Sequence, residues 1–150
     1  MLLSIIKFFH IIAGISFFGI TIAAFFYITR SIHKRDHALI DYSIKTSYFG
    51  DALILLCILI QVASAISLTS AGHFTLSVPW IFVAYHAFGF LILLWIINIL
   101  IKKFLLSKLV IAPYSLKSFY YLNIVMIFVF MMIIHDAVTK STCLAFLFGR

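Results

Sequence analysis

The sequence predicts an all-α, polytopic membrane protein: a single domain, residues 1–150, built as a four-transmembrane-helix bundle. Two observations predict this fold class. Hydrophobic residues make up 65% of the chain and charged residues only 10%, a balance far from that of a soluble domain. The apolar residues also fall into four long stretches, each reaching the roughly 20 residues that a helix needs to cross the hydrocarbon of a bilayer.

The four predicted helices cover approximately residues 4–29, 48–70, 79–101 and 118–138. Each helix satisfies its own backbone hydrogen bonds, which hydrocarbon would leave unmet, so a helix bundle is the architecture expected. The first stretch has too long an apolar run for a secretory signal, and no basic cluster precedes it. It is therefore predicted to be a helix of the mature protein.

Polar and aromatic residues near the predicted helix ends support these limits. Asp51 lies at the predicted start of the second helix, where a carboxylate favours the positive end of the helix dipole. Trp80 and Trp95 bracket the third helix, as aromatic residues do at membrane interfaces. Asn98 and Asn123 fall near the inner boundary, where polar residues are expected. We therefore assign these five residues to helix ends.

The distribution of Lys and Arg predicts the orientation. Basic residues gather in the connections after the first and third helices: Arg30, Lys34, Arg35, Lys45, Lys102, Lys103, Lys108 and Lys117. Both connections are therefore expected to be cytoplasmic and both termini outside, which is the periplasmic side of a bacterial inner membrane. The basic residues behind the net charge of +7 then set the orientation in the membrane and contact the lipid bilayer. No nucleic-acid partner is expected.

Two residues of the second predicted helix have simple structural interpretations. Cys57 is expected to be a small buried packing residue, and its distance in depth from Cys143, in the apolar tail, argues against a disulfide. Gln61, near the middle of the helix, is expected to hydrogen-bond a neighbouring helix. The alternative roles of Gln61 are to bind a ligand or to line a polar path.

Histidines are the strongest indication of chemistry, because an imidazole in lipid needs hydrogen-bond partners and commonly marks a site. Of the six histidines, His33 and His37 belong to a solvated cytoplasmic connection, and His73 belongs to a solvated outer turn. The remaining histidines, His10, His86 and His135, are predicted at similar depths on three helices, near the outer face.

Small and aromatic residues accompany these histidines at helical spacing. His10 shares a stripe with Gly14, His86 shares one with Gly89, and His135 lies on a stripe of Phe and Met residues. Haem b is held by axial imidazoles from different helices, with apolar contacts to its ring. The predicted cofactor-binding residues are therefore His10, Gly14, His86, Gly89 and His135, with the three histidines as metal ligands.

Two alternatives to haem remain open. Imidazoles also bind copper or zinc, and each histidine could simply hydrogen-bond a neighbouring helix or interfacial water. Asp136, next to His135, would either orient an imidazole and accept its proton or meet water or Lys140.

Several short motifs carry a family resemblance. They are Phe9-His10-Ile11-Ile12-Ala13-Gly14, Phe18-Gly19, Phe25 to Arg30, Gly50-Asp51, Pro79-Trp80 and Leu94-Trp95. Over nearly the whole chain the sequence resembles an uncharacterised family of small bacterial predicted integral membrane proteins. That family is distantly similar to HemJ-type protoporphyrinogen oxidase and to the membrane domain of CopD-type copper proteins.

The HemJ resemblance implies a bound haem b and an equivalent of His10 in the first helix. The chain departs from the HemJ pattern in Val83 to Ala87, which lacks the His-x-Lys arrangement, and at Lys140, which Ser141 rather than Pro follows. Haem binding is therefore expected ahead of the oxidase activity.

The leading hypothesis is a b-type haem protein of the bacterial inner membrane that transfers electrons with a quinone or another membrane redox partner. The alternatives are a HemJ-like protoporphyrinogen oxidase, a protein that handles copper or another metal, and an accessory subunit without cofactor. No residue is assigned as catalytic, and the oligomeric state stays open, with a homo-oligomer among the alternatives.

Overall fold

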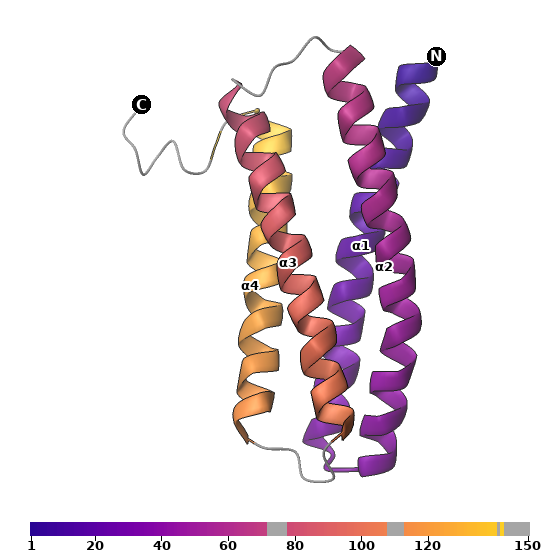
Figure 1. Ribbon diagram of the computed structural model, residues 1–150, viewed down its shortest axis with the longest axis vertical. Helices are drawn as coiled ribbons and strands as arrows, with labels where there is room; N and C mark the ends of the chain where they lie inside the picture. Colours follow the sequence, from indigo (N-terminus) through magenta and orange to yellow (C-terminus); the bar gives the residue numbers. More distant parts are fainter. Residues whose placement is uncertain (72–77, 108–112, 141, 143–150) are drawn as a thin grey trace.

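The computed structural model describes residues 1–71, 78–107, 113–140 and 142 and shows an all-α chain (Figure 1). Its four helices are α1 (Leu2–His33), α2 (His37–Ala71), α3 (Pro79–Ser107) and α4 (Pro113–Thr139). Each contains a segment long and apolar enough to cross a membrane. The predicted fold class, an all-α chain with four such helices, is confirmed for the described residues.

The helices form two hairpins that lie side by side (Figure 1). α1 packs along α2, and α3 packs along α4, whereas the two hairpins touch less extensively, through α1 with α4 and α2 with α3. α1 and α3 therefore occupy diagonal positions. The start of α1 and the end of α4 lie at the same end of the bundle (Figure 1).

α2 begins at His37 rather than near residue 48, because a side-chain cap starts the helix early. The Asp36 Oδ1 atom accepts hydrogen bonds from the backbone N–H groups of Ala38 at 3.0 Å and Leu39 at 3.1 Å, as N-cap carboxylates do. The connection from α1 is correspondingly short, and Arg35 adopts a φ of 54° within it. Asp51 consequently lies about four turns inside α2 rather than at its start.

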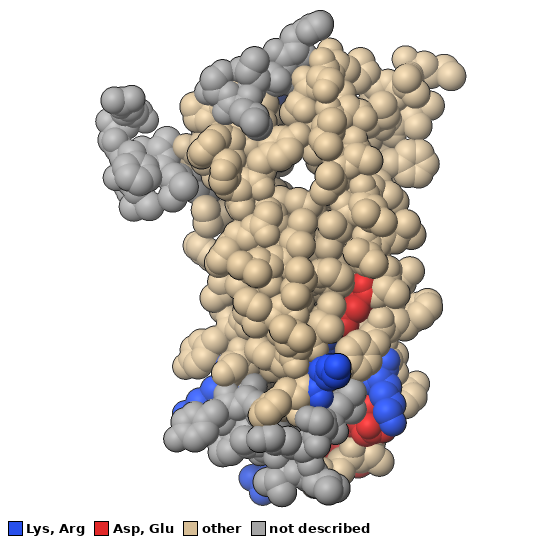
Figure 2. All heavy atoms as spheres, in the orientation of Figure 1, with Lys and Arg blue, Asp and Glu red and all other residues tan. Residues whose placement is uncertain are grey.

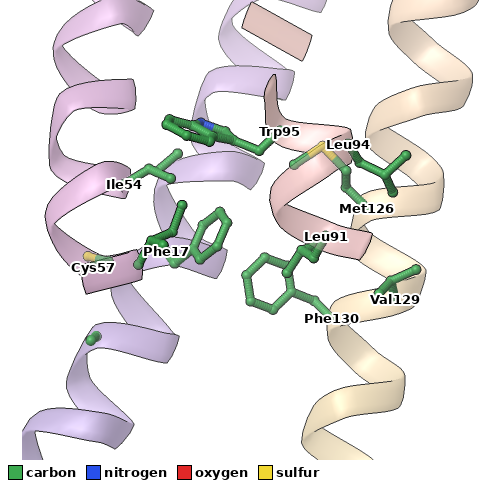
Figure 3. Packing of buried hydrophobic residues seen from close by; sticks show 11 residues of the cluster. Phe17, Ile54, Cys57, Leu91, Leu94, Trp95, Met126, Val129 and Phe130 are labelled. Carbon is green, nitrogen blue, oxygen red and sulfur yellow. The ribbon is translucent and has the colours of Figure 1, made fainter. Parts of the chain in front are cut away.

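The apolar core takes residues from all four helices (Figure 3). Phe17 is fully buried at its centre, with its ring edge-on to Phe130 at a centroid distance of 4.6 Å. Figure 3 shows the Trp95 indole reaching from α3 toward Ile54 of α2. Cys57 is buried in the same core, as predicted. The core thus joins the two hairpins that share few backbone contacts.

Outside this core, the surface of the bundle is itself apolar. Large hydrophobic side chains are exposed along every helix, among them Phe8, Leu59, Phe90 and Phe128. The described Lys, Arg and Asp residues gather mostly at the end that holds the α1–α2 connection (Figure 2). A helix surface of this kind suits lipid rather than water.

Candidate functional site

His10 lies half-buried on the face of α1 that meets α2. Its Nδ1 atom is 2.8 Å from the Ser64 hydroxyl, and that hydroxyl is 2.5 Å from the carbonyl oxygen of Ile60. A hydroxyl has only one proton to donate, and serine inside a helix usually donates it to a preceding carbonyl. Ser64 therefore accepts from His10 Nδ1–H, which leaves the lone pair of the imidazole on Nε2.

Gln61 and Gly14 complete this contact between α1 and α2. The Gln61 amide donates from Nε2 to the His10 carbonyl oxygen at 2.9 Å. A Cβ atom added at Gly14 would lie 2.5 Å from that same Nε2, so a side chain at this position would displace the amide from the His10 carbonyl oxygen. The predicted role of Gln61 as a contact between helices is confirmed. Gly14 leaves space for the Gln61 amide.

His86 lies on a different kind of surface. Its side chain is exposed, and Nδ1–H donates to the Phe82 carbonyl oxygen of its own helix at 2.8 Å. Its ring lies 4.1 Å from the Phe82 ring. Phe90 is exposed on the same face, and a Cβ atom at Gly89 would meet nothing within 4 Å.

The stripe of α3 that contains His86 was expected to turn into the bundle, and it does not. The opposite face of α3 is buried instead, and it carries Trp95, Asn98 and Lys102. A charged or amide group in an apolar surrounding is costly without partners, and partners for these three exist only inside the bundle. Burying them leaves His86 outside.

His135 is also largely outside the bundle, with 51% of its side chain exposed. Its Nδ1 atom is 3.2 Å from Oδ1 of Asp136, which is 1% exposed. The contact between Asp136 and an imidazole, one of the two predicted alternatives, is therefore present.

The three candidate ligands thus have three separate partners: Ser64 for His10, Phe82 for His86 and Asp136 for His135. Among the described residues, no group of three or more His, Cys or Asp side chains is placed to hold a metal ion. His33 and His37 are exposed, as predicted. His73, Cys143 and the tail lie outside the described residues.

A buried ion pair joins α2 to α3 in the charged half of the bundle. The Lys102 Nζ atom donates to Asp51 Oδ2, and both residues are buried. The Trp95 indole Nε1–H donates to the other carboxylate oxygen at 3.2 Å. Lys102 also lies 5.7 Å from the ring centroid of Tyr48. Both oxygens of Asp51 are therefore engaged from α3.

A buried pair of amides continues this arrangement from α3 to α4. Asn98 donates from Nδ2 to Asn123 Oδ1 at 2.9 Å and contacts the sulfur of Met126 at 3.6 Å. Asn123 in turn donates from Nδ2 to the Phe119 carbonyl oxygen at 2.8 Å. We call Asp51, Trp95, Asn98, Lys102 and Asn123 the polar cluster.

The polar cluster corrects several predictions from the sequence. Asp51 does not begin a helix and Lys102 is not in a connection, because α2 and α3 extend beyond their predicted ends. Trp95 is buried between the helices, where its indole donates to Asp51. The sequence did contain a signal for the cluster. Trp95, Asn98 and Lys102 follow one another at steps of three and four residues, which places them on one face of a helix.

Comparison of the chain with models of protein families, with curated proteins and with solved structures gave no match. Function is therefore inferred from the polar cluster and from the surroundings of His10.

Proposed function

We propose that the protein spans a membrane several times and exchanges a proton at Asp51, with Lys102 as the counter-charge. The observation that supports this proposal is the buried ion pair of Asp51 and Lys102 between apolar helices. Ionisable side chains inside membrane helices are costly, and they commonly mark ion pathways and proton relays.

The position of the pair along the bundle suits exchange with one aqueous side. Lys45 is exposed on α2, and Asp51 follows it by six residues, or about 9 Å along the helix. Because the charged end of the bundle is rich in Lys and Arg (Figure 2), we place it in the cytoplasm of a bacterium and both termini outside. Asp51 then lies in the inner leaflet.

The geometry gives proton uptake a structural consequence. While the carboxylate of Asp51 is ionised, the pair has no net charge. A proton on Asp51 leaves the Lys102 ammonium without a counter-charge in a medium of low dielectric constant. The long Lys102 side chain then favours the nearby aqueous boundary, beside the exposed Lys103. Proton uptake thereby weakens the contact between α2 and α3, and so between the two hairpins.

Trp95 supplies a direct test, because Trp80 is the only other tryptophan. In a Trp80→Phe variant in liposomes, Trp95 emission should change as the pH falls and Asp51 loses its charge. The same titration of Trp80→Phe with Asp51→Asn should be flat. Liposomes containing an entrapped pH dye would show whether the proton crosses. Trp95 emission that stays constant over the pH range in which the protein remains folded would reduce the ion pair to a structural role.

We propose a second candidate function, haem-dependent electron transfer, on a separate observation. The Nδ1–H group of His10 is held by Ser64, which leaves Nε2 free, and a ligand imidazole is commonly oriented in this way through its second nitrogen. The space-filling view also shows an opening between the hairpins in the half away from the charged end (Figure 2). A haem b there would exchange electrons with a quinone or a membrane protein, with HemJ-like oxidation and copper handling as related alternatives.

Within a single chain, the residues provide one axial ligand for haem, His10, and not two. His86 faces outward, so it would reach such a group only from another copy. Protein expressed with adequate haem should show a Soret band that His10→Ala abolishes. Ser64→Ala should perturb the band, and His33→Ala, an exposed control, should not. Metal analysis separates copper from iron, and colourless protein would eliminate the haem proposal.

A further inference from the structure

One polar atom of the polar cluster lacks a hydrogen-bond partner among the described residues. The Asn98 side chain is 5% exposed, and its Oδ1 atom is buried without a donor. A buried amide oxygen that has lost its water and gained no donor carries a substantial desolvation penalty, and buried polar groups in native proteins are nearly always satisfied. The missing donor therefore points to a ligand.

Turning the Asn98 amide over does not solve the problem. Asn98 Nδ2 faces Asn123 Oδ1 at 2.9 Å, and Asn123 is itself fixed by donation to the Phe119 carbonyl oxygen at 2.8 Å. A flipped Asn98 would place two amide oxygens against each other. Its oxygen therefore points away from Asn123.

Asn98 lines a small cavity together with other members of the polar cluster. Its volume is about 10 Å³, and its polar partners for a ligand come from Asp51, Asn98, Lys102 and Asn123. Thr21 also lines it, but its hydroxyl donates to the Phe17 carbonyl oxygen of its own helix. The volume is close to the smallest that holds a water molecule, and a buried water needs two to four polar partners. A larger ligand does not fit, and the Lys102 ammonium opposes a metal cation.

We infer that this cavity binds one water molecule, which donates a hydrogen bond to Asn98 Oδ1. Lys102 has two further N–H donors for the water oxygen, and the carboxylate oxygens of Asp51 retain lone pairs for its second proton. The water connects the amide pair to the ion pair, which otherwise share no hydrogen bond among the described residues. The role of this water rests on the function proposed above: it is the proton carrier nearest to Asp51.

Selective labelling can detect this water, because Asn98 and Asn123 are the only asparagines of the chain. In protein labelled with ¹⁵N-asparagine, NMR should show transfer of magnetisation from a bound water to the Asn98 side-chain amide. The transfer should persist in Thr21→Val, which has the same size and loses only a hydroxyl that is bonded to its own helix at Phe17. It should vanish in Thr21→Ile, whose additional carbon fills the cavity.

Thermal melting gives a second readout with the same pair of variants. If water occupies the cavity, Thr21→Ile leaves Asn98 Oδ1 without a donor and melts below Thr21→Val. If the cavity is dry, the added carbon fills a void and Thr21→Ile melts above Thr21→Val. Absence of water transfer in the wild type, or a higher melting temperature for Thr21→Ile, would overturn the inference. Neither measurement depends on proton exchange, so the water and the proposed function of Asp51 are tested separately.

Discussion

Asp51 and Lys102 form a buried ion pair between α2 and α3, although 51 positions separate them in the sequence. Trp95 donates to the remaining oxygen of the same carboxylate. Because α2 and α3 belong to different hairpins, these two contacts bind one hairpin to the other inside a mostly apolar interface. A buried charge is tolerated only with its partner.

The ion pair should respond differently to single and double substitutions. Asp51→Asn and Lys102→Met should each lower the free energy of unfolding by about 3–5 kcal/mol, because each leaves an uncompensated buried charge. The double variant should lose much less than the sum. Denaturant unfolding in micelles measures all three. If the loss of the double variant equalled the sum of the two single losses, the two residues would not be a coupled pair.

The chain contains a matched control for this experiment. Asp41 and Lys45 form an exposed pair at 2.7 Å, four residues apart on α2. Asp41→Asn and Lys45→Gln should each change stability by less than about 1 kcal/mol, since solvent screens exposed pairs.

A side chain at Gly14 should displace the amide of Gln61. A Cβ atom there lies 2.5 Å from Gln61 Nε2, so Gly14→Ala should move this flexible amide away from the His10 carbonyl oxygen and lower the free energy of unfolding by about 0.5–1.5 kcal/mol, the contribution of one hydrogen bond. Gly19→Ala is the control, because its Cβ atom would meet nothing within 4 Å. Gln61→Ala should relieve the penalty of Gly14→Ala, and an undiminished penalty in that double variant would exclude this clash as the cause.

His10 should be a single tautomer, with its proton on Nδ1. The Ser64 hydroxyl donates to a backbone carbonyl and so accepts from the imidazole. ¹⁵N NMR of labelled histidine distinguishes a protonated Nδ1 from a protonated Nε2, and His10→Gln identifies the signal. Ser64→Ala should produce a mixture of tautomers. A proton on Nε2 in the wild type would remove the support for metal binding at this position.

His86 and His10 should contribute unequally to stability. His86 is exposed, and among the described residues its side chain is hydrogen-bonded within its own helix, so His86→Leu should change stability by less than about 0.5 kcal/mol. His10→Leu removes the hydrogen bond to buried Ser64 and should cost about 1–3 kcal/mol. Thermal melting of both variants without added haem makes the comparison, and a large loss for His86→Leu would place its ring in an interface.

Cysteine labelling should reveal the orientation. In a background of Cys57→Ala and Cys143→Ala, a Lys45→Cys variant should react with an impermeant thiol reagent only after the cytoplasmic side is opened. A Lys7→Cys variant should react in intact spheroplasts. The reverse pattern would place the charged end of the bundle outside.

The sequence predicted the number and type of the helices, because length and uniform hydrophobicity alone indicate four candidate spans. It also predicted the burial of Cys57 and the contact of Gln61 with a neighbouring helix, which the structure identifies as α1. These properties are local, or follow from placing one polar residue in the middle of an apolar helix.

Only the tertiary structure decided which faces meet. In a soluble helix an apolar stripe identifies the buried face, but lipid is as apolar as the core, so the hydrophobic pattern of these helices does not distinguish inside from outside. Hydrogen bonds between polar side chains decided which faces turn inward: Asp51 pairs with Lys102 and Trp95, and Asn98 pairs with Asn123. Satisfying these groups turned one face of α3 inward and left His86 outside, because an unpaired charge in hydrocarbon costs more than an exposed neutral imidazole bonded to its own helix.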